Sequence, residues 1–190
     1  MKRFTQSLLV AMSLGLAACS LTPKTASQND QQRVYVRQVT NQTLEHLYKA
    51  NPSARAAVAK SAGYAVFSDI GFKFGVLGGA KGEGLAVNNA TGEQTFMRMV
   101  ELQPGLGIGA NSFRTVFVFE RPASLSEFVN SGWAIGANVM AAAKSKKEGG
   151  AYSGAIQVAP GVHLYQFTQE GLIVGVSVTG AKYYKDPDLN

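Results

Sequence analysis

The sequence predicts an α+β domain, built as a curved antiparallel, barrel-like β-sheet with N-terminal helices and one short inserted helix. Three observations indicate this fold. Apolar residues recur at helical spacing before Gly63, and strand-like alternation dominates after it. Most of the 21 glycines lie inside apolar segments. Glycine within a strand usually marks a bulge, a bend at a barrel corner or a close backbone approach, so the expected sheet is sharply bent.

Residues 1–18 have the features of a secretory signal peptide. Lys2 and Arg3 form a short basic start, an apolar run follows, and Leu-Ala-Ala precedes Cys19, the only cysteine. The apolar run is shorter than the roughly 20 residues that a membrane-spanning helix needs. A cysteine directly after this triplet resembles the lipobox of bacterial lipoproteins, in which the thiol is lipidated and the chain is cut before it. An ordinary signal peptide with a chance cysteine is the alternative.

The chain after Cys19 is expected to divide into three parts. Residues 19–30 are polar and aperiodic, so they are interpreted as a lipidated tether. Residues 31–185 form a single domain, large enough to bury a core. Residues 186–190 are a polar tail. With Cys19 lipidated, no thiol remains for a disulfide, and packing alone must hold an exported domain together.

Two helices are expected at the start of the domain. Between residues 31 and 49, apolar side chains recur at three- and four-residue steps. Pro52 ends this helix because proline cannot continue the hydrogen-bond ladder. Ser53 is a suitable N-cap for a second helix that ends at Lys60. A third, short helix is expected from Ser124, because Ser-Leu-Ser-Glu fits a capping box.

Strands are expected wherever apolar residues alternate or form short β-branched and aromatic runs. Ile70 and the apolar residues at every second position after it are typical of a half-buried strand. Asn88 to Gly92 is a turn cluster. The expected strands are residues 64–67, 70–76, 85–87, 94–102, 105–110, 114–120, 133–139, 155–158, 162–167 and 172–178.

Net charge restricts the classes of partner. The chain carries +6 at pH 7, which becomes +4 without Lys2 and Arg3. A mildly basic surface suits anionic lipid headgroups, although the same charge serves solubility equally well. Nucleic acid is excluded as a partner, because an exported chain without a basic aromatic motif has no means to recognise it.

The sequence offers no catalytic motif. His46 and His163 lack metal-ligand spacing, so no metal site and no cofactor are expected, and both are interpreted as structural or surface residues. Thr179 stands where a G-x-S-x-G elbow around Ser177 needs its second glycine. The protein is therefore expected not to be an enzyme. A catalytic role on lipids or peptidoglycan would be indicated by a cleft that holds His163 within hydrogen-bond reach of a carboxylate.

Lysines near aromatic residues form the candidate binding site. Lys73 lies between two phenylalanines. Lys81 lies in a glycine-rich run that fails the P-loop pattern because Gly82 follows it. This run is interpreted as a sharply bent hairpin, and a weak headgroup-binding turn with Lys81 as its charge is the alternative. The remaining candidates are Lys144, Lys146, Lys147 and Lys182. Such lysines are what an anionic membrane surface attracts. A solvated loop is the alternative for Lys144 to Lys147.

Ordered landmarks along the chain resemble a known family. They are the segment 61–67 (Ser-Ala-Gly-Tyr-Ala-Val-Phe), the glycine run 75–84, the spaced glycines of 105–109, and Gly171-Leu172 with Gly180-Ala181-Lys182. Together they are similar to the SYLF domain family, in particular to its bacterial lipoprotein branch, over residues 31–185. The resemblance implies a single β-rich domain that binds anionic phospholipids without catalysis. Some eukaryotic members also bind actin, which an exported lipoprotein does not meet in its own cell.

The sequence therefore predicts a lipoprotein of the bacterial cell envelope, anchored in a phospholipid membrane by acyl chains on Cys19. Ser20 after the cysteine, rather than aspartate, is consistent with the outer membrane. The expected ligand is an anionic lipid headgroup or another envelope component. The alternative is a structural or protein-interaction lipoprotein with an unidentified protein partner and incidental lipid affinity.

Overall fold

The computed structural model describes residues 25–75, 77–102, 107–136, 152–168, 171–173 and 180–190. For residues 72–75, 77, 107–111, 168 and 171–173 the description covers the backbone alone. Cys19 and the lysines at positions 144, 146 and 147 lie outside the described residues.

Three helices are present among the described residues: α1 (Ala26–Ala50), α2 (Ser53–Lys60) and α3 (Pro122–Ser131). The helix α1 begins five residues earlier than expected, within the segment assigned to the tether. Thr25 and Gln28 form a capping box there, which satisfies backbone N–H groups of the first turn. The helix α3 begins at Pro122 rather than at Ser124, because proline at the first helical position gives up no needed hydrogen bond.

The described strands form one antiparallel sheet in the order β5-β9-β3-β2-β1-β4-β7-β6, with β8 also paired to β7. Their bounds are β1 (Gly63–Gly75), β2 (Leu77–Asn88), β3 (Gln94–Leu102), β4 (Gly107–Phe119), β5 (Trp133–Gly136), β6 (Ile156–Ala159), β7 (Val162–Thr168), β8 (Gly171–Ile173) and β9 (Gly180–Lys185). The predicted α+β class with a curved, barrel-like sheet is confirmed. The expected strands 105–110 and 114–120 are a single strand, β4, and β9 was not anticipated.

The concave face of the sheet encloses the main core. Ile135 in β5 and Ile156 in β6 lie at opposite ends of the strand order, yet both belong to one buried cluster. The sheet must therefore curl around that cluster. Aromatic rings fill its centre: the ring centroids of Phe67 and Tyr183 are 4.7 Å apart, and those of Phe117 and Tyr183 are 5.0 Å apart. Phe128 of α3 packs into the same cluster.

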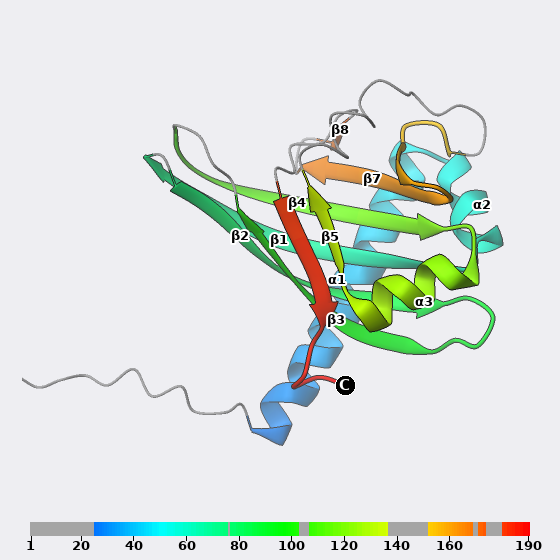
Figure 1. The fold of residues 1–190 in the computed structure, drawn as a ribbon, viewed down its shortest axis with the longest axis horizontal. Helices are drawn as coiled ribbons and strands as arrows, with labels where there is room; N and C mark the ends of the chain where they lie inside the picture. Colours follow the sequence, from blue (N-terminus) through cyan, green and yellow to red (C-terminus); the bar gives the residue numbers. More distant parts are fainter. Residues whose placement is uncertain (1–24, 76, 103–106, 137–151, 169–170, 174–179) are drawn as a thin grey trace, which may run out of the picture.

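The convex face is only partly covered. Leu44 and Leu47 of α1, with Val58 of α2, pack on Val116 and Tyr165 in a second buried cluster. Figure 1 shows α1 and α3 on opposite faces of the sheet. None of the three described helices combines the length and hydrophobicity that crossing a bilayer requires.

Residues 186–190 pack onto the sheet. Leu189 is 2% exposed and lies in a small cluster with Val36 and Phe96. The side chain of Asn190 donates to the carbonyl oxygen of Phe96 at 2.8 Å, and Arg98 pairs with Asp186 at 2.8 Å. The last five residues thus join α1 to β3.

Candidate functional site

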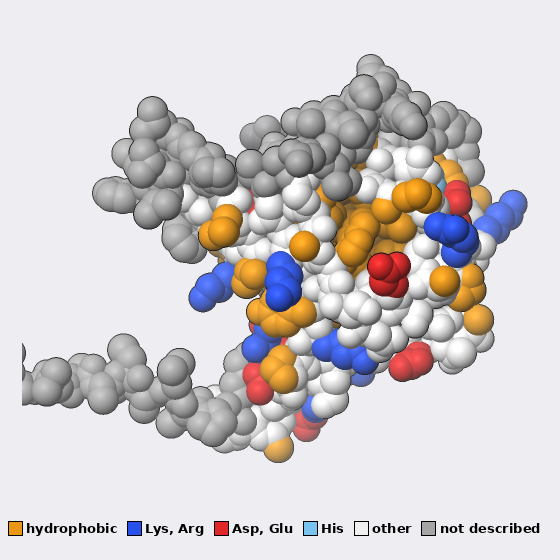
Figure 2. Space-filling model, viewed as in Figure 1, with side chains coloured by type: hydrophobic (Ala, Val, Ile, Leu, Met, Phe, Trp, Pro, Cys, Tyr) orange, Lys and Arg blue, Asp and Glu red, His pale blue; other side chains and the backbone are white. Residues whose placement is uncertain are grey.

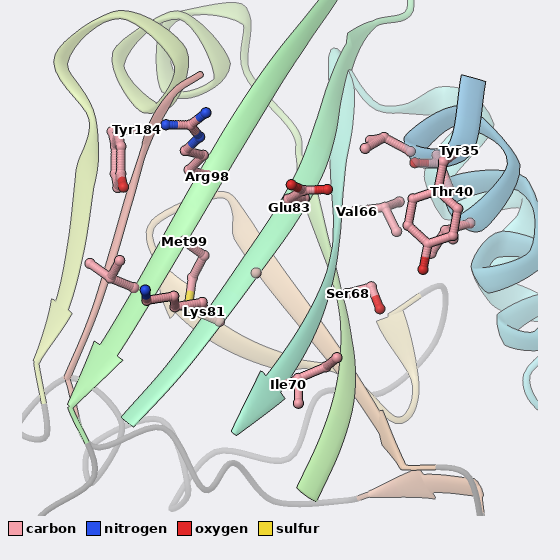
Figure 3. A pocket seen from close by; sticks show the side chains of 14 residues that line it. Tyr35, Thr40, Val66, Ser68, Ile70, Lys81, Glu83, Arg98, Met99 and Tyr184 are labelled. Carbon is pink, nitrogen blue, oxygen red and sulfur yellow. The ribbon is translucent and has the colours of Figure 1, made fainter. Parts of the chain in front are cut away.

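A groove lies on the convex face, where α1 leaves strands β1, β2 and β3 uncovered. Its volume is about 580 Å³, within the range of small-molecule sites. In Figure 3, Tyr35 and Thr40 of α1 lie beside Val66 and Ser68 of β1, and Lys81 extends from β2 across β3. The lining residues are Tyr35, Val36, Val39, Thr40, Val66, Ser68, Ile70, Lys81, Gly82, Glu83, Arg98, Met99, Val100 and Tyr184.

One row of side chains crosses the open end of this groove. The strand register pairs Ile70 with Lys81, Lys81 with Val100, and Val100 with Lys182. Directly paired residues on neighbouring strands point to the same face, so the four side chains stand in line on the convex face. We call them, together with Leu102 two positions along β3, the exposed row.

The exposed row combines hydrophobic surface with positive charge. Ile70 is 69% exposed and Leu102 is 75% exposed, which is unusual for large aliphatic side chains in one patch. Lys81 and Lys182 make no hydrogen bond or ion pair with the described residues. Figure 2 shows basic and hydrophobic side chains intermixed on the visible surface.

The neighbouring row inside the groove is already internally satisfied. Glu83 accepts a hydrogen bond from Gln32 of α1. Arg98, its partner in the register, donates to Asp186 at 2.8 Å and to Asp188 at 2.5 Å. Burial lowers the pKa of Arg98, but its bonds to Asp188 and Asp186 outweigh that effect and raise the pKa overall. Within the described residues, Lys81 is therefore the cation of the groove that is left for a ligand.

The structure brings together two of the six predicted headgroup lysines. Lys81 and Lys182 are about 100 positions apart in the sequence, but β3 places them on either side of Val100. Lys73 lies in β1, paired with Gly78 and Gly109, in the part of that strand described as backbone alone. The other three lie outside the described residues, so their role stays a prediction.

Sequence reasoning missed the hydrophobic half of the site. The alternation around Ile70 correctly predicted a strand but implied a half-buried position, whereas Ile70 is exposed because α1 does not reach it. Val100 and Leu102 alternate with the buried Met99 and Glu101 along β3. That alternation was the available signal for an apolar row on the open face.

His163 meets a carboxylate without forming a catalytic cleft. Its Nε2 lies 3.0 Å from Oε1 of Glu120, and its ring stacks on Tyr152 with 3.6 Å between centroids. The residue is 2% exposed, and it lines none of the four principal clefts that the described residues form. His46 packs on Phe167 at 5.7 Å. Both contacts fit the structural role assigned to these residues.

A buried carboxyl group lies on the concave side of β1. Asp69 is 3% exposed and accepts a hydrogen bond from the backbone N–H of Phe113 at 3.0 Å. Burial raises the pKa of Asp69 to about 7, and the nearby charge of Glu101 adds to the increase. No three or more histidine, cysteine, aspartate or glutamate side chains of the described residues are grouped to hold a metal ion.

Comparison with known proteins gives two matches. Beta cell expansion factor A from Aeromonas veronii is 33% identical over 171 residues, an alignment that covers 89% of this chain and 62% of that protein. The chain thus spans less than two thirds of that relative's length. Residues 100–190 match the Ysc84 family, described as Las17-binding protein actin regulator. That description names a binding activity and not an enzymatic one. The two matches confirm the expected resemblance to the SYLF domain family.

Proposed function

We propose that this protein is a lipid-anchored lipoprotein of the bacterial outer membrane whose domain binds anionic phospholipid headgroups through the exposed row. The observation that carries the proposal is the alignment of Lys81, Val100 and Lys182 beside Ile70 and Leu102 on an uncovered sheet face. The match of residues 100–190 to a family described by a binding activity supports a binding role.

The composition of the row suits the interface between water and lipid. A Lys near an anionic membrane surface contributes about 1 kcal/mol, and an aliphatic side chain that leaves water contributes roughly 1.5–3 kcal/mol when fully buried. Two lysines and three aliphatic side chains, none of them fully buried on contact with a headgroup layer, therefore give a weak, reversible attachment. A tether converts weak attachment into high occupancy, because it holds the domain at a high effective concentration near the membrane.

The tether is the second part of the proposal. Transfer of a diacylglycerol group to the Cys19 thiol and acylation of its new amine would supply several acyl chains, each buried CH₂ contributing about 0.8 kcal/mol. Mass spectrometry of the protein from its native membrane should find Cys19 as the modified N-terminal residue. An unmodified Cys19, or cleavage at another position, would refute the anchor while leaving headgroup binding intact.

Vesicle flotation tests headgroup binding. All contacts described above lie within residues 25–190, so a chain that begins at Ser20 keeps the folded domain. We expect this chain to float with vesicles that contain 30% phosphatidylglycerol and not with pure phosphatidylcholine vesicles. Equal binding to both compositions, or to neither, would refute an anionic headgroup site.

A pair of matched variants assigns the binding to the row. Lys81→Gln with Lys182→Gln removes two charges from the row, and Lys49→Gln with Lys60→Gln removes two exposed charges from α1 and α2. We expect at least a tenfold loss of vesicle affinity in the first variant and little change in the second. Equal losses would mean that net charge alone attracts the protein. The same assay with Lys144, Lys146 and Lys147 replaced tests the loop lysines.

A protein partner is the second candidate, because the matched family is described by binding to a protein. An exposed apolar row beside free lysines also fits an acidic protein surface. Crosslinking through position 102 in intact cells distinguishes the two candidates. Crosslinks to one envelope protein, together with failed flotation, would favour the protein partner over lipid.

A further inference from the structure

The groove behind the exposed row is deeper than headgroup binding needs. Its wall continues from the row to the ring of Tyr35, which is 55% exposed, and beneath this wall lie the buried side chains of Val36 and Val66. The half-buried Val39 of α1 adds to this apolar lining. A patch that only touches headgroups would be flat, whereas this surface has an interior lined by hydrophobic side chains.

The charged side chains of the groove divide into two sets. Glu83 and Arg98 already have partners, in Gln32 and in the two C-terminal aspartates. Lys81 stands at the open end, where no described residue forms an ion pair with it. A ligand that complements this arrangement has an apolar body for the walls and one negative charge for the ammonium group. A ligand with a charge at each end would place one charge against the hydrophobic wall of the groove, which is costly.

We propose that the groove binds a single long-chain anionic amphiphile, with its hydrocarbon chain between α1 and β1 and its anionic head at Lys81. The proposal builds on the headgroup function above, since Lys81 serves both, but it assigns a separate site that takes one molecule out of water or out of a bilayer. The volume of about 580 Å³ fits one chain-sized ligand and not a folded partner.

The test uses monomeric probes below their critical micelle concentration, on the chain that begins at Ser20. Hexadecanoate represents a free fatty acid, and palmitoyl-lysophosphatidylglycerol represents a lipid with the same chain. Palmitoyl-lysophosphatidylcholine has that chain without net charge. Calorimetry should show one site per protein for at least one anionic probe, with at least fivefold weaker binding of the zwitterionic probe. The tighter of the two anionic probes identifies the source of the ligand.

Filling the groove should remove this binding selectively. Ser68 lies on its floor (Figure 3), so Ser68→Phe places a ring where the chain would lie. Ala90→Phe, in the exposed turn between β2 and β3, is the matched control. We expect at least a tenfold loss of amphiphile affinity for Ser68→Phe and none for Ala90→Phe, while both variants still float with anionic vesicles. If Ser68→Phe does not fold, Val39→Phe fills the groove from the side of the helix.

The outcomes separate the two proposals. Vesicle binding without stoichiometric amphiphile binding, or unchanged amphiphile affinity in Ser68→Phe, would overturn the groove proposal and leave the headgroup function standing. Amphiphile binding without vesicle binding would overturn the headgroup function alone. A dimer in solution that Ser68→Phe dissociates would also overturn the groove proposal, because it would assign the groove to a second copy of the chain.

Discussion

The two faces of the sheet differ in what covers them. On the concave face the sheet closes on its own side chains, and Phe117 contacts five other aromatic rings without any exposure. On the convex face two helices cover one part, and beyond them Ile70 and Leu102 remain in solvent. The same strands supply both faces, so alternate residues of one strand serve stability and binding. We expect changes on the concave face to alter stability and changes on the convex face to alter binding.

The largest expected effect comes from Phe117→Ala. Truncation of a fully buried aromatic ring leaves a cavity and should lower the free energy of unfolding by about 3–5 kcal/mol. Tyr35→Ala removes a ring that is 55% exposed on the convex side and should cost far less. Urea denaturation of both variants measures the difference. Similar losses would contradict the division of roles between the faces.

Asp69→Asn should change how stability depends on pH. The pKa of this carboxyl group rises from 3.8 to about 7 on folding, so the folded protein holds a proton that the unfolded chain releases. Asp69 therefore stabilises the fold fully below pH 3.8, and this contribution is lost as pH rises to about 7, with a slope of at most about 1.4 kcal/mol per pH unit. This stability is lost because the deprotonated, charged form of Asp69 is buried, with the charge of Glu101 nearby.

Asparagine keeps an oxygen that accepts the N–H of Phe113 and carries no charge. The variant should be more stable than the natural protein at pH 8, with a flatter profile between pH 4 and 7. Thermal unfolding across this pH range measures the effect, and the exposed Asp30→Asn serves as the control. A profile for Asp69→Asn that runs parallel to that of the natural protein would contradict the buried carboxyl group as its cause.

Gly84→Ala tests why β2 contains so many glycines. A methyl group at Gly84 would lie 2.4 Å from Cδ1 of Phe67 and 2.5 Å from the carbonyl oxygen of Val66. Overpacking of this kind typically costs about 1–3 kcal/mol. At Gly136 a methyl group meets nothing within 4 Å, so Gly136→Ala should be nearly neutral. Equal melting temperatures for the two variants would show that the sheet yields easily around Phe67.

The smallest effect on stability is expected at Ile70. Ile70→Ser on the open convex face should change the free energy of unfolding by no more than about 0.5 kcal/mol, while affinity for anionic vesicles falls severalfold. Val34→Ser is a matched control, since Val34 is 63% exposed on α1 outside the exposed row. Flotation of both variants checks this, and a loss of stability at Ile70 without a loss of binding would reverse the role assigned to the row.

Local patterns predicted much of the fold. Helical spacing and Pro52 located α1 and α2, alternation located β1, and a strand-like run located β3, because these signals depend on neighbours in the sequence. The glycine-rich β2 was predicted only from residue 85, because the need for glycine at position 84 comes from Phe67 on another strand. The packed C-terminal residues were missed for the same reason: Leu189 is buried by Val36 and Phe96, which are remote in the sequence.

The candidate site was predicted only in part. Lys81 was chosen as the charge of a glycine-rich turn and Lys182 for its tyrosine neighbours. Their alignment depends on the register of β3 with both β2 and β9. Register between strands that lie far apart along the chain is set by tertiary packing and not by any local motif. The exposure of Ile70 likewise depends on where α1 lies over the sheet.

The position of β9 has a consequence for the order in which the domain can assemble during synthesis. This strand, made from residues 180–185, lies between β3 and β5 and supplies Tyr183 to the aromatic core. Among the described strands β5 pairs only with β9, so β5 cannot join the sheet until those residues have emerged. A chain interrupted before residue 180 would lack Lys182, Tyr183 and the pairing of β5 together. Partial products should therefore remain open and protease-sensitive, and the binding face should form only at the end of synthesis.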